Sequence, residues 1–380
     1  MLKITGIICE YNPLHLGHKK QIEVIREQEP DGIIVCLMSG NYVQRGKPAI
    51  VDKSLRAKAA VLAGADLVLE LPITAALASA EGFAAEGVRI LSRFCTHLCF
   101  GAETAKAESL ISTAKALLRE DFPEFLRAEL DKGLSFPAAR SAALEAMGLS
   151  AVAKPNDILA VEYCKAILSQ DSPLIPWPIQ RGGDYHEEAA DEENPSATAV
   201  RKLMLQSGMW LDYVPQEVRA CFRDAILHSM DAGERAVLAK LRTMTDAEFE
   251  RIPYGSEGLW RKLMHNARRF ACLEDVITAT KSKRYTRTRL DRMVMCAFLE
   301  ISEEMIRSPA PYVRLLAFND KGRSLLRQKK EDFPVVNAGV SMDCPYWELE
   351  KRSGDLYGLF AEGLPEVPSS EENRRVVYVR

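Results

Sequence analysis

Short apolar runs alternate with longer segments of helical spacing through the first half of the chain, and no other feature constrains the fold as strongly. The apolar runs predict five strands, at Leu2–Glu10, Gly32–Ser39, Asp66–Leu71, His97–Phe100 and Leu174–Ile179. The segments between them predict helices at Gly17–Arg26, Lys53–Ala63, Glu81–Arg93 and Ala105–Leu118. Strands that alternate with helices form βαβ units. We therefore expect an α/β fold with a Rossmann-like parallel sheet that helices cover on both faces.

The carboxyl ends of the predicted strands mark the expected binding crevice. An open parallel sheet binds its ligands there, beside the point where the strand order reverses. Four short segments each follow one of the predicted strands: Glu10–Asn12, Ser39–Asn41, Glu70–Pro72 and Gly101–Glu103. We expect these segments to surround one site.

Beyond about Glu217 the chain changes character, because glycine becomes sparse and helical spacing dominates. Helices are expected at Glu217–Ala232, Asp246–Arg251, Gly258–Cys272 and Thr286–Glu300, and one further strand at Tyr312–Phe318. A chain of 380 residues is also longer than one small domain requires. We predict a sheet-containing catalytic domain at 1–212 and a mostly α-helical domain at 213–380.

The segment Gly6–His18, with the sequence GIICEYNPLHLGH, carries the clearest chemistry. Asn12 and Pro13 suit the start of a helix, and His15 and His18 then share one face of its first turn. Unpaired backbone N–H groups and the positive end of the helix dipole lie at that turn. Two imidazoles placed there form a site for a polyphosphate and can donate hydrogen bonds to a leaving pyrophosphate. We therefore predict that this segment binds a nucleotide.

A pair of structural core histidines or a zinc site is the alternative for His15 and His18. Zinc-binding histidine pairs on helices usually lie four residues apart and need further ligands. No other cluster of His or Cys supplies them, so we predict no metal site built by the protein. Gly17, between the two histidines, lacks a side chain and would let an adenine or a ribose lie against the helix.

The segment Asn194–Lys202, with the sequence NPSATAVRK, is the second candidate for phosphate binding. Ser196 and Thr198 place hydroxyl groups at an expected helix start, where each can also serve simply as a cap. Arg201 follows on the first turn, and its guanidinium group suits a phosphate. We expect this segment to face the two histidines across the nucleotide.

Basic residues are concentrated in one part of a chain whose net charge is −3. The stretch from Arg261 to Arg292 contains ten Lys or Arg residues and only three acidic residues. The ten are Arg261, Lys262, Arg268, Arg269, Lys281, Lys283, Arg284, Arg287, Arg289 and Arg292. Trp260 and Tyr285 lie among them. The pattern favours an RNA-binding surface with stacking positions, and a solvated helical face is the alternative.

These segments together resemble known families. GIICEYNPLHLGH resembles the HxGH signature of the nucleotidyltransferase superfamily that includes class I aminoacyl-tRNA synthetases and the adenylyl- and cytidylyltransferases, and SATAVR resembles the second motif of that group. Over nearly its whole length the chain is similar to the tRNA(Met) cytidine acetate ligase family. The further segments that carry this resemblance are MSGNYVQRGKPAIVDK (38–53), GADLVLELP (64–72), FGAE (100–103), KPNDILAVEY (154–163), PWPIQRGGDYHE (176–187), NPSATAVRK (194–202) and KRYTRTRLDR (283–292).

The resemblance implies an HxGH-type Rossmann-like fold and a two-step reaction on tRNA. Acetate and ATP would form acetyl-adenylate and pyrophosphate, and the acetyl group would pass to N4 of the wobble cytidine in elongator methionine tRNA. Mg²⁺ would accompany the nucleotide, held by phosphate and water. A small-molecule adenylyl- or cytidylyltransferase is the alternative, and a nucleotide-sensing RNA-binding protein without turnover is a third interpretation.

The resemblance also implies roles for particular residues. Those implied in catalysis are His15, His18 and Arg201. Those implied in binding ATP are Ile7, Ile8, Cys9, Glu10, Tyr11, Asn12, Pro13, Leu14, His15, Leu16, Gly17, His18, Lys19, Lys20, Gly101, Asn156 and Arg181, to which we add Ser196 and Thr198. Those expected to bind tRNA are Lys283, Arg284, Arg287, Arg289 and Arg292.

Weaker candidates remain for the acetate site and for the acceptor of the amine proton. Residues that would lie on a loop over the strand ends are candidates to hold acetate: Asn41, Gln44, Arg45 and Lys53. Asp184 and His186 are candidates to accept the proton of the cytidine amine. The remaining histidines, His97, His228 and His265, are expected to be structural.

Composition indicates the compartment. No run of about 18 apolar residues is present to span a membrane, and the N-terminus lacks the apolar core of a signal peptide. Nine cysteines are scattered singly, which predicts neither a disulfide framework nor a zinc site. We expect a cytoplasmic protein with no membrane contact, and no protein partner is implied.

Overall fold

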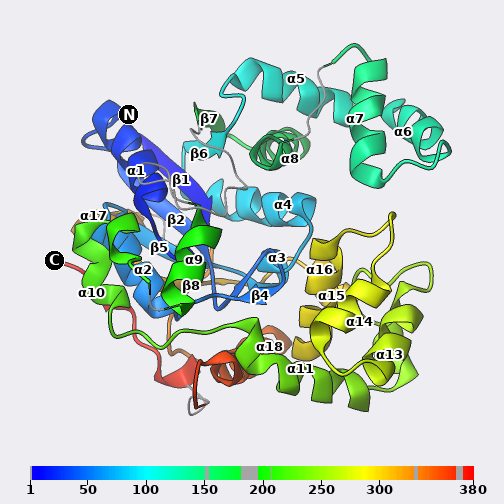
Figure 1. Ribbon diagram of the computed structural model, residues 1–380. Helices are drawn as coiled ribbons and strands as arrows, with labels where there is room; N and C mark the ends of the chain where they lie inside the picture. The colour runs from blue at the N-terminus through cyan, green and yellow to red at the C-terminus, as the bar shows by residue number, and fades with distance from the viewer. Residues whose placement is uncertain (1, 150–153, 181–195, 207, 329–332, 365–370) are drawn as a thin grey trace.

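A computed structural model describes residues 2–149, 154–180, 196–206, 208–328, 333–364 and 371–380 (Figure 1). Five strands form a parallel sheet in the order β5-β2-β1-β6-β7. Their bounds are β1 (Ile4–Cys9), β2 (Ile33–Ser39), β5 (Leu67–Leu71), β6 (His97–Ala102) and β7 (Ile175–Gln180). The chain builds outward from β1 to β2 and β5, and then returns to place β6 on the other side of β1. The strand order therefore reverses between β1 and β6, which confirms the predicted α/β fold and locates its switch point.

Two hydrophobic cores lie on the two faces of this sheet. In the fully buried strand β2, Ile33, Val35 and Leu37 pack into one core, and Ile34, Cys36 and Met38 into the other. The alternation follows from the two-residue period of a strand, and both faces are apolar because helices cover both.

The helices that cover the sheet divide between its two faces (Figure 1). α1 (Leu16–Gln28), α2 (Lys53–Leu62) and α9 (Ala197–Leu205) supply apolar residues to one core. α4 (Ala80–Leu91), α8 (Pro155–Ser169) and α17 (Asp320–Gln328) supply them to the other. Between β2 and α2 lies a hairpin of β3 (Tyr42–Val43) and β4 (Lys47–Pro48), and the short α3 (Ile73–Ala76) follows β5.

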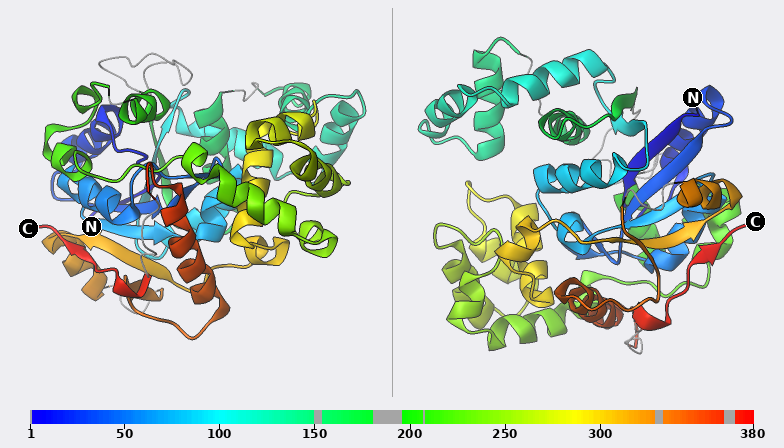
Figure 2. Two further views of the ribbon diagram at one scale, coloured as in Figure 1. Left: turned by 60° about the horizontal axis from the view of Figure 1, so that its bottom comes forward. Right: turned by 180° about the vertical axis from the view of Figure 1, so that it is seen from behind.

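The end of the chain returns to the sheet, so strands from the predicted second domain (213–380) extend the sheet of the predicted first domain (1–212). β8 (Val313–Phe318) pairs antiparallel with β5, and both β9 (Val335–Asn337) and β10 (Val377–Tyr378) pair with β8 (Figure 2). Val313 and Leu315 enter one core of the sheet while Leu316 and Ala317 enter the other. The sequence located this strand correctly, but its pairing partner lies more than 240 residues earlier in the chain.

A separate helical lobe with its own core lies between α9 and β8 in the sequence. Its helices are α11 (Met230–Thr243), α12 (Asp246–Glu250), α13 (Leu259–Arg269), α14 (Leu273–Thr280), α15 (Arg287–Leu299) and α16 (Glu303–Arg307), and α18 (Pro345–Tyr357) packs against it. The predicted helix at Glu217–Ala232 is wrong. That stretch begins with the 3-10 turn Gln216–Val218 and the short α10 (Arg219–Phe222). The long helix begins only after Ser229, whose hydroxyl accepts a hydrogen bond from the backbone N–H of Ala232 (3.1 Å).

A second group of helices projects beside α8 as an arm (Figure 1). It consists of α5 (Ala107–Leu117), α6 (Phe122–Leu130) and α7 (Phe136–Ala146), with a small core of its own around Phe122 and Leu144. In the part of the chain that the structure describes, no helix combines the length and the apolar character needed to cross a membrane.

Candidate functional site

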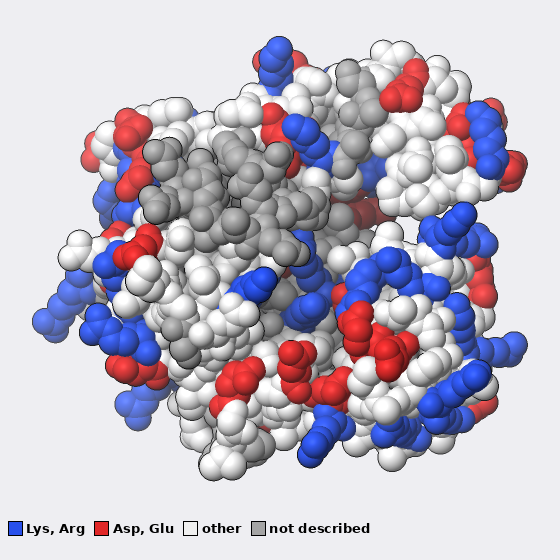
Figure 3. Space-filling model, in the orientation of Figure 1, with Lys and Arg blue, Asp and Glu red and all other residues white. Residues whose placement is uncertain are grey.

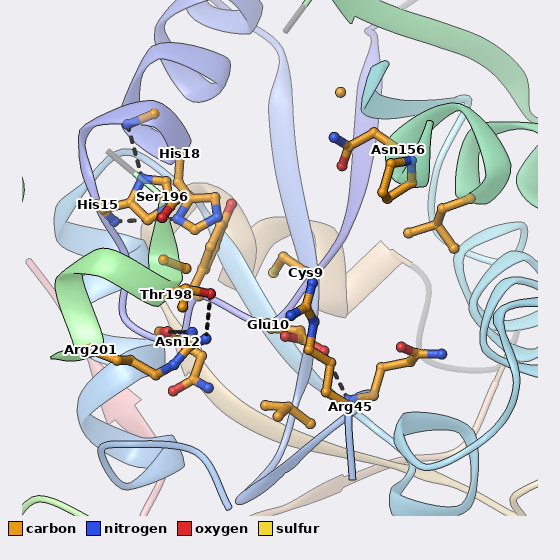
Figure 4. A pocket seen from close by; sticks show the side chains of 18 of the residues that line it. Cys9, Glu10, Asn12, His15, His18, Arg45, Asn156, Ser196, Thr198 and Arg201 are labelled. Atoms are coloured by element: carbon orange, nitrogen blue, oxygen red, sulfur yellow. Dashed lines mark hydrogen bonds between the residues drawn. The ribbon is translucent and has the colours of Figure 1, made fainter. Parts of the chain in front are cut away.

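A cavity of about 900 Å³ opens at the carboxyl end of β1, beside the switch point of the sheet. The lining comes from β1 and the loop after it, the β3–β4 hairpin, and the first turns of α8 and α9, and it includes all three residues with implied catalytic roles, His15, His18 and Arg201 (Figure 4). The nucleotide-binding candidates in the lining are Ile7, Ile8, Cys9, Glu10, Tyr11, Asn12, His15, Gly17, His18, Lys20, Gly101, Asn156, Ser196 and Thr198. Residues more than 190 positions apart in the sequence therefore form one site.

Four candidates from the same segment are not part of this lining. They are Pro13, Leu14, Leu16 and Lys19. Leu14 is fully buried in a core of the sheet, and Lys19 forms an ion pair with Glu217 (2.8 Å). A further candidate, Arg181, lies outside the described residues, as do Asp184 and His186.

The start of α1 differs from the prediction, because His15 and not Asn12 is its N-cap. The imidazole Nδ1 of His15 accepts a hydrogen bond from the backbone N–H of Gly17 (3.1 Å). The Nδ1 of His18 accepts one from the backbone N–H of His15 (3.3 Å), so the two histidines form a reciprocal capping box. Asn12 instead accepts a hydrogen bond from the backbone N–H of Ile50 through its side-chain oxygen (2.7 Å).

This capping box fixes the tautomer of both imidazoles. A neutral imidazole that accepts a hydrogen bond at Nδ1 carries its proton on Nε2. The two rings stack with their centroids 3.8 Å apart, and His15 is only 1% exposed. His15 and His18 are therefore held as Nε2–H tautomers, and both residues line the cavity.

Gly17 lies close against the His15 ring in this same geometry. A Cβ atom at Gly17 would lie 3.1 Å from Cε1 and 3.2 Å from Nδ1 of His15. The missing side chain at Gly17 therefore leaves room for the His15 ring, which folds back over the start of α1.

Arg201 joins α9 to the first segment. Its Nη1 donates a hydrogen bond to the backbone carbonyl of Asn12 (2.7 Å), and its Nη2 donates one to the hydroxyl of Thr198 (3.1 Å). Ser196 is the N-cap of α9, where its hydroxyl accepts from the backbone N–H of Ala199 (3.1 Å). The guanidinium group is therefore held beside the helix start of α9, below the two histidines in the view of Figure 4.

The opposite side of the cavity holds Asn156, on the first turn of α8, and Gly101, which lies within β6. The side-chain amide of Asn156 donates a hydrogen bond to Glu103 (2.7 Å), and the other carboxylate oxygen of Glu103 accepts from the backbone N–H of Asp157 (2.9 Å). Glu103 thus orients Asn156. The sequence placed Glu103 at the crevice as a strand-end residue but gave it no role.

The four candidates for the acetate site separate into two groups. Gln44 and Arg45 line the cavity. Lys53 does not, because it is buried and forms ion pairs with Glu70 (2.8 Å) and Glu371 (2.9 Å). Burial opposes the Lys53 charge, but these two carboxylates outweigh it and raise the pKa of Lys53. Asn41 accepts a hydrogen bond from the backbone N–H of Lys53 (2.9 Å) and is also buried.

The helical lobe also reaches the cavity, which the sequence did not predict. His228, Ser229, Asp231 and Thr288 are part of its lining. His228, expected to be purely structural, is 3% exposed, and its ring stacks on that of Tyr357 with a centroid separation of 3.9 Å. No local sequence signal distinguished these residues, since they come together only when the lobe packs on the sheet.

The basic run is divided between surface and interior. Lys and Arg side chains gather over α13–α15 on the face shown in Figure 3. Lys283 and Arg284 are exposed, and Arg284 forms an ion pair with Glu257 (2.8 Å). Arg287 contacts Glu274 and Asp291 through short ion pairs (2.6 and 2.9 Å).

The other two basic candidates on α15 differ in their exposure. Arg289 is partly exposed and donates hydrogen bonds to the backbone carbonyl of Tyr254 (2.9 and 3.1 Å). Arg292 is 8% exposed and lies over the ring of Tyr254 at 5.2 Å. Burial lowers the pKa of Arg292. Its position argues against the predicted contact with tRNA, because a phosphate cannot reach a side chain inside the lobe.

Within the described ranges, no three His, Cys, Asp or Glu side chains are grouped so that they could hold a metal ion. All nine cysteines of the chain lie in described segments and are free thiols.

The chain matches the family model of HIGH Nucleotidyl Transferases over residues 2–371. The tRNA(Met) cytidine acetate ligase of Acetivibrio thermocellus is 35% identical to it over 364 residues, with 88% of each chain covered. The protein of the same name from Clostridium acetobutylicum is 30% identical, and the match covers 100% of both chains.

Solved structures agree with these relatives. The apo crystal structure of Thermotoga maritima TmcAL matches with a TM-score of 0.91 at 28% sequence identity, over 100% of both chains. The structure of the same protein bound with alpha-thio ATP matches with a TM-score of 0.88, again over 100% of both chains.

Proposed function

This chain belongs to the HIGH nucleotidyl transferase family and, within it, to the tRNA(Met) cytidine acetate ligases, and from this premise we propose that it is an ATP-dependent ligase that acetylates N4 of the wobble cytidine of elongator methionine tRNA. The reaction proceeds through acetyl-adenylate. The observation that carries the proposal is that the two Nε2–H imidazoles and Arg201 line one cavity.

The first step joins acetate to the α-phosphorus of ATP. A carboxylate oxygen of acetate attacks the α-phosphorus in line with the bond from phosphorus to pyrophosphate. That bond breaks, and pyrophosphate leaves with its electron pair. His15, His18 and Arg201 supply hydrogen-bond donors and positive charge on the side of the leaving group. Gly101 and Asn156 line the opposite side and suit the ribose and adenine.

The second step transfers the acetyl group. The cytidine N4 nitrogen attacks the carbonyl carbon of acetyl-adenylate, AMP leaves, and the nitrogen gives up a proton to a base. Ser229, Asp231 and Thr288 extend the cavity toward the helical lobe, so the cytidine enters from that direction.

Mg²⁺ would be held mainly by the phosphates of ATP and by water, since the described residues offer no cluster of three metal ligands. When bound, it would neutralise phosphate charge. ATP and tRNA are both found in the cytoplasm, and we place the protein there.

We propose that exposed and partly exposed basic residues of the helical lobe bind tRNA phosphates. Lys283, Arg284, Arg287 and Arg289 are the candidates near the start of α15. The positive charge continues along α13, whose exposed basic residues are Arg261, Lys262, Arg268 and Arg269. The guanidinium group of Arg261 lies over the ring of Trp260 (4.9 Å). Arg292 is left out because it is buried.

Replacing Arg284, Arg287 and Arg289 together with alanine is expected to weaken tRNA binding by about tenfold or more and to lower the slope of log affinity against log salt by roughly one unit per lost phosphate contact. A salt titration of tRNA binding measures both. The matched control is Arg307→Ala, which removes an arginine with a 77% exposed side chain from α16 of the same lobe. Equal affinity and slope in the triple variant and the wild type would remove this surface from the proposal.

The overall proposal is tested by ATP–pyrophosphate exchange, with and without acetate and with and without bulk tRNA. Exchange that depends on acetate supports acetyl-adenylate formation. Exchange that appears only when tRNA is added would mean that tRNA organises the site. Absence of exchange in every arm would reject the ligase and favour a small-molecule adenylyl- or cytidylyltransferase.

A further inference from the structure

We propose that Arg45 binds the carboxylate of acetate, and that the β3–β4 hairpin which presents Arg45 is positioned by the packing of α15 against Gly46. This inference rests on the proposed function and assigns the site of its smallest substrate. The ligand class is a small monocarboxylate.

Arg45 is placed where the attacking carboxylate must lie. Figure 4 shows its side chain directed into the cavity toward Cys9 and Glu10, while His15, His18 and Arg201 lie further to the left in the same view. In-line attack requires the nucleophile and the leaving pyrophosphate on opposite sides of the α-phosphorus. If the histidines and Arg201 hold the pyrophosphate, the carboxylate approaches from the side of Arg45.

The other cations near the site are less suited to this role. Four of the described residues that line the cavity are Lys or Arg: Lys20, Arg45, Lys47 and Arg201. Lys20 is exposed on α1, next to the histidines, and Lys47 is exposed at the rim, beside Asp291 and Glu274.

A fifth cation, Arg56, is buried at the end of β1 but is occupied by the backbone. Its guanidinium group donates hydrogen bonds to the carbonyl groups of Val51 (2.8 Å), Glu10 (2.6 Å), Ser39 (3.1 Å) and Gly40. Arg56 does not line the cavity, whereas Arg45 does, and the planar guanidinium group of an arginine matches the geometry of a carboxylate.

The hairpin that carries Arg45 is anchored at its base to the sheet. The backbone N–H of Gln44 donates a hydrogen bond to the carboxylate of Glu10 at the end of β1 (2.9 Å). The backbone N–H of Ala49 donates one to the carbonyl of Asn41 and closes the hairpin (2.9 Å). The position of Arg45 is thus tied to the same strand end that carries the first segment of the nucleotide site.

The tip of the hairpin is held from outside by α15. Gly46 has a φ of +70°, and a Cβ atom there would lie 2.4 Å from the backbone nitrogen of Arg292. Arg292 packs over the Tyr254 ring (5.2 Å), and the Tyr254 hydroxyl donates a hydrogen bond to the carbonyl of Leu77 (2.8 Å). Any side chain at position 46 would therefore push the hairpin and α15 apart. Arg292, predicted to contact tRNA, instead belongs to this junction.

The Arg45→Ala variant tests the binding role. We expect the KM for acetate in ATP–pyrophosphate exchange to rise by about 10- to 100-fold, the range expected for loss of a charge-assisted hydrogen-bonded pair. Equilibrium binding of ATP should stay within about twofold of the wild type. Arg45→Lys should recover part of the lost acetate affinity, because it restores the charge without the fork.

The Gly46→Ala variant tests the positioning role. We expect the KM for acetate to rise about tenfold or more with unchanged ATP affinity, because the displaced hairpin moves Arg45. Gly148→Ala is the matched control, since Gly148 has a similar φ of +78° but no atom within 4 Å of an added Cβ. The control reproduces the backbone strain without the collision and should leave the KM for acetate unchanged.

The outcomes separate this inference from the function on which it rests. Acetate-dependent exchange in the wild type together with an unchanged acetate KM in Arg45→Ala would overturn the Arg45 site alone. Equal loss of ATP and acetate affinity in Arg45→Ala would assign Arg45 to the nucleotide instead. A wild type that never responds to acetate would overturn the proposed function and the acetate site with it.

Discussion

Replacing His18 with alanine is expected to lower the rate of acetyl-adenylate formation by about 10²–10³-fold, the usual effect of removing one donor that stabilises developing charge. The Nδ1 of His18 accepts the backbone N–H of His15, which leaves Nε2–H as the donor toward the cavity. The effect should appear in kcat of ATP–pyrophosphate exchange, since the donor acts on charge that grows as pyrophosphate leaves.

The same substitution removes one side of the α1 capping box, so its structural cost must be measured separately. Loss of an N-cap contact costs about 1 kcal/mol of stability. Glu248→Ala is a matched control, because Glu248 accepts the backbone N–H of the N-cap Thr245 in the capping box at the start of α12, as His18 does for His15, and neither Glu248 nor Thr245 lines the cavity. Both variants should lose similar free energy of unfolding in urea, and only His18→Ala should lose turnover. Near-normal turnover in His18→Ala would falsify the catalytic role.

Lys53→Met is expected to lower the free energy of unfolding by about 3–5 kcal/mol, the usual cost of removing one partner from a buried ion pair. Lys53 has a 5% exposed side chain and contacts both Glu70 and Glu371. Without it, Glu70 loses its cation, while Glu371 keeps an ion pair with Arg374 (2.7 Å). Urea unfolding at pH 7 measures the loss.

The pH dependence of this loss has a definite sign. The raised pKa of Lys53 means that its contribution is complete below the usual lysine pKa of 10.5 and disappears only at more alkaline pH. Burial raises the pKa of Glu371, but Lys53 and Arg374 outweigh it and lower that pKa below its usual value of 4.5. The Glu371 contribution is therefore lost as the pH falls through its lowered value, and the difference between wild type and Lys53→Met should shrink at acid pH.

Lys132→Met provides the comparison for an exposed ion pair. Lys132 has a 63% exposed side chain and contacts Glu129 (2.6 Å), and such surface pairs contribute about 0–1 kcal/mol. A loss in Lys53→Met no larger than in Lys132→Met would contradict the buried-cluster interpretation. An increase in acetate KM without loss of stability would return Lys53 to the list of acetate ligands.

Apolar periodicity was sufficient to locate the sheet. β2 was predicted at Gly32–Ser39 and is found at Ile33–Ser39, because seven consecutive buried residues, with turn residues on either side, fit a strand covered on both faces. The same reasoning failed at Glu217–Ala232. The apolar residues of that stretch lie on short turns and a single-turn helix, and from there they pack into a core of the sheet. Their spacing therefore did not indicate a continuous helix.

The first segment of the site was also predictable in kind but not in detail. A strand that ends before two histidines three residues apart predicts a helix start that faces a ligand. The N-cap of α1 could not be assigned from the sequence, because Asn12 makes its hydrogen bonds to residues far along the chain. Its side-chain oxygen accepts from the backbone N–H of Ile50, 38 positions further on, and its backbone carbonyl accepts from Arg201, 189 positions further on. The residue left to cap the helix was His15.

The sequence by itself determined the elements and chemical groups that depend on near neighbours: the strands and helices of the first half, the histidine pair, and the position of Arg201 one turn into α9. Only the tertiary structure decided which charged residues meet. From the sequence, Lys53 and Arg292 were expected to be accessible cations. In the structure both are buried, Lys53 in an ion pair with Glu371 and Arg292 over the ring of Tyr254. The same holds for β8, whose apolar pattern was plain but whose place beside β5 was not. Periodicity records burial along one element, whereas the partner of a charge or of a strand edge is chosen by packing between elements far apart in the chain.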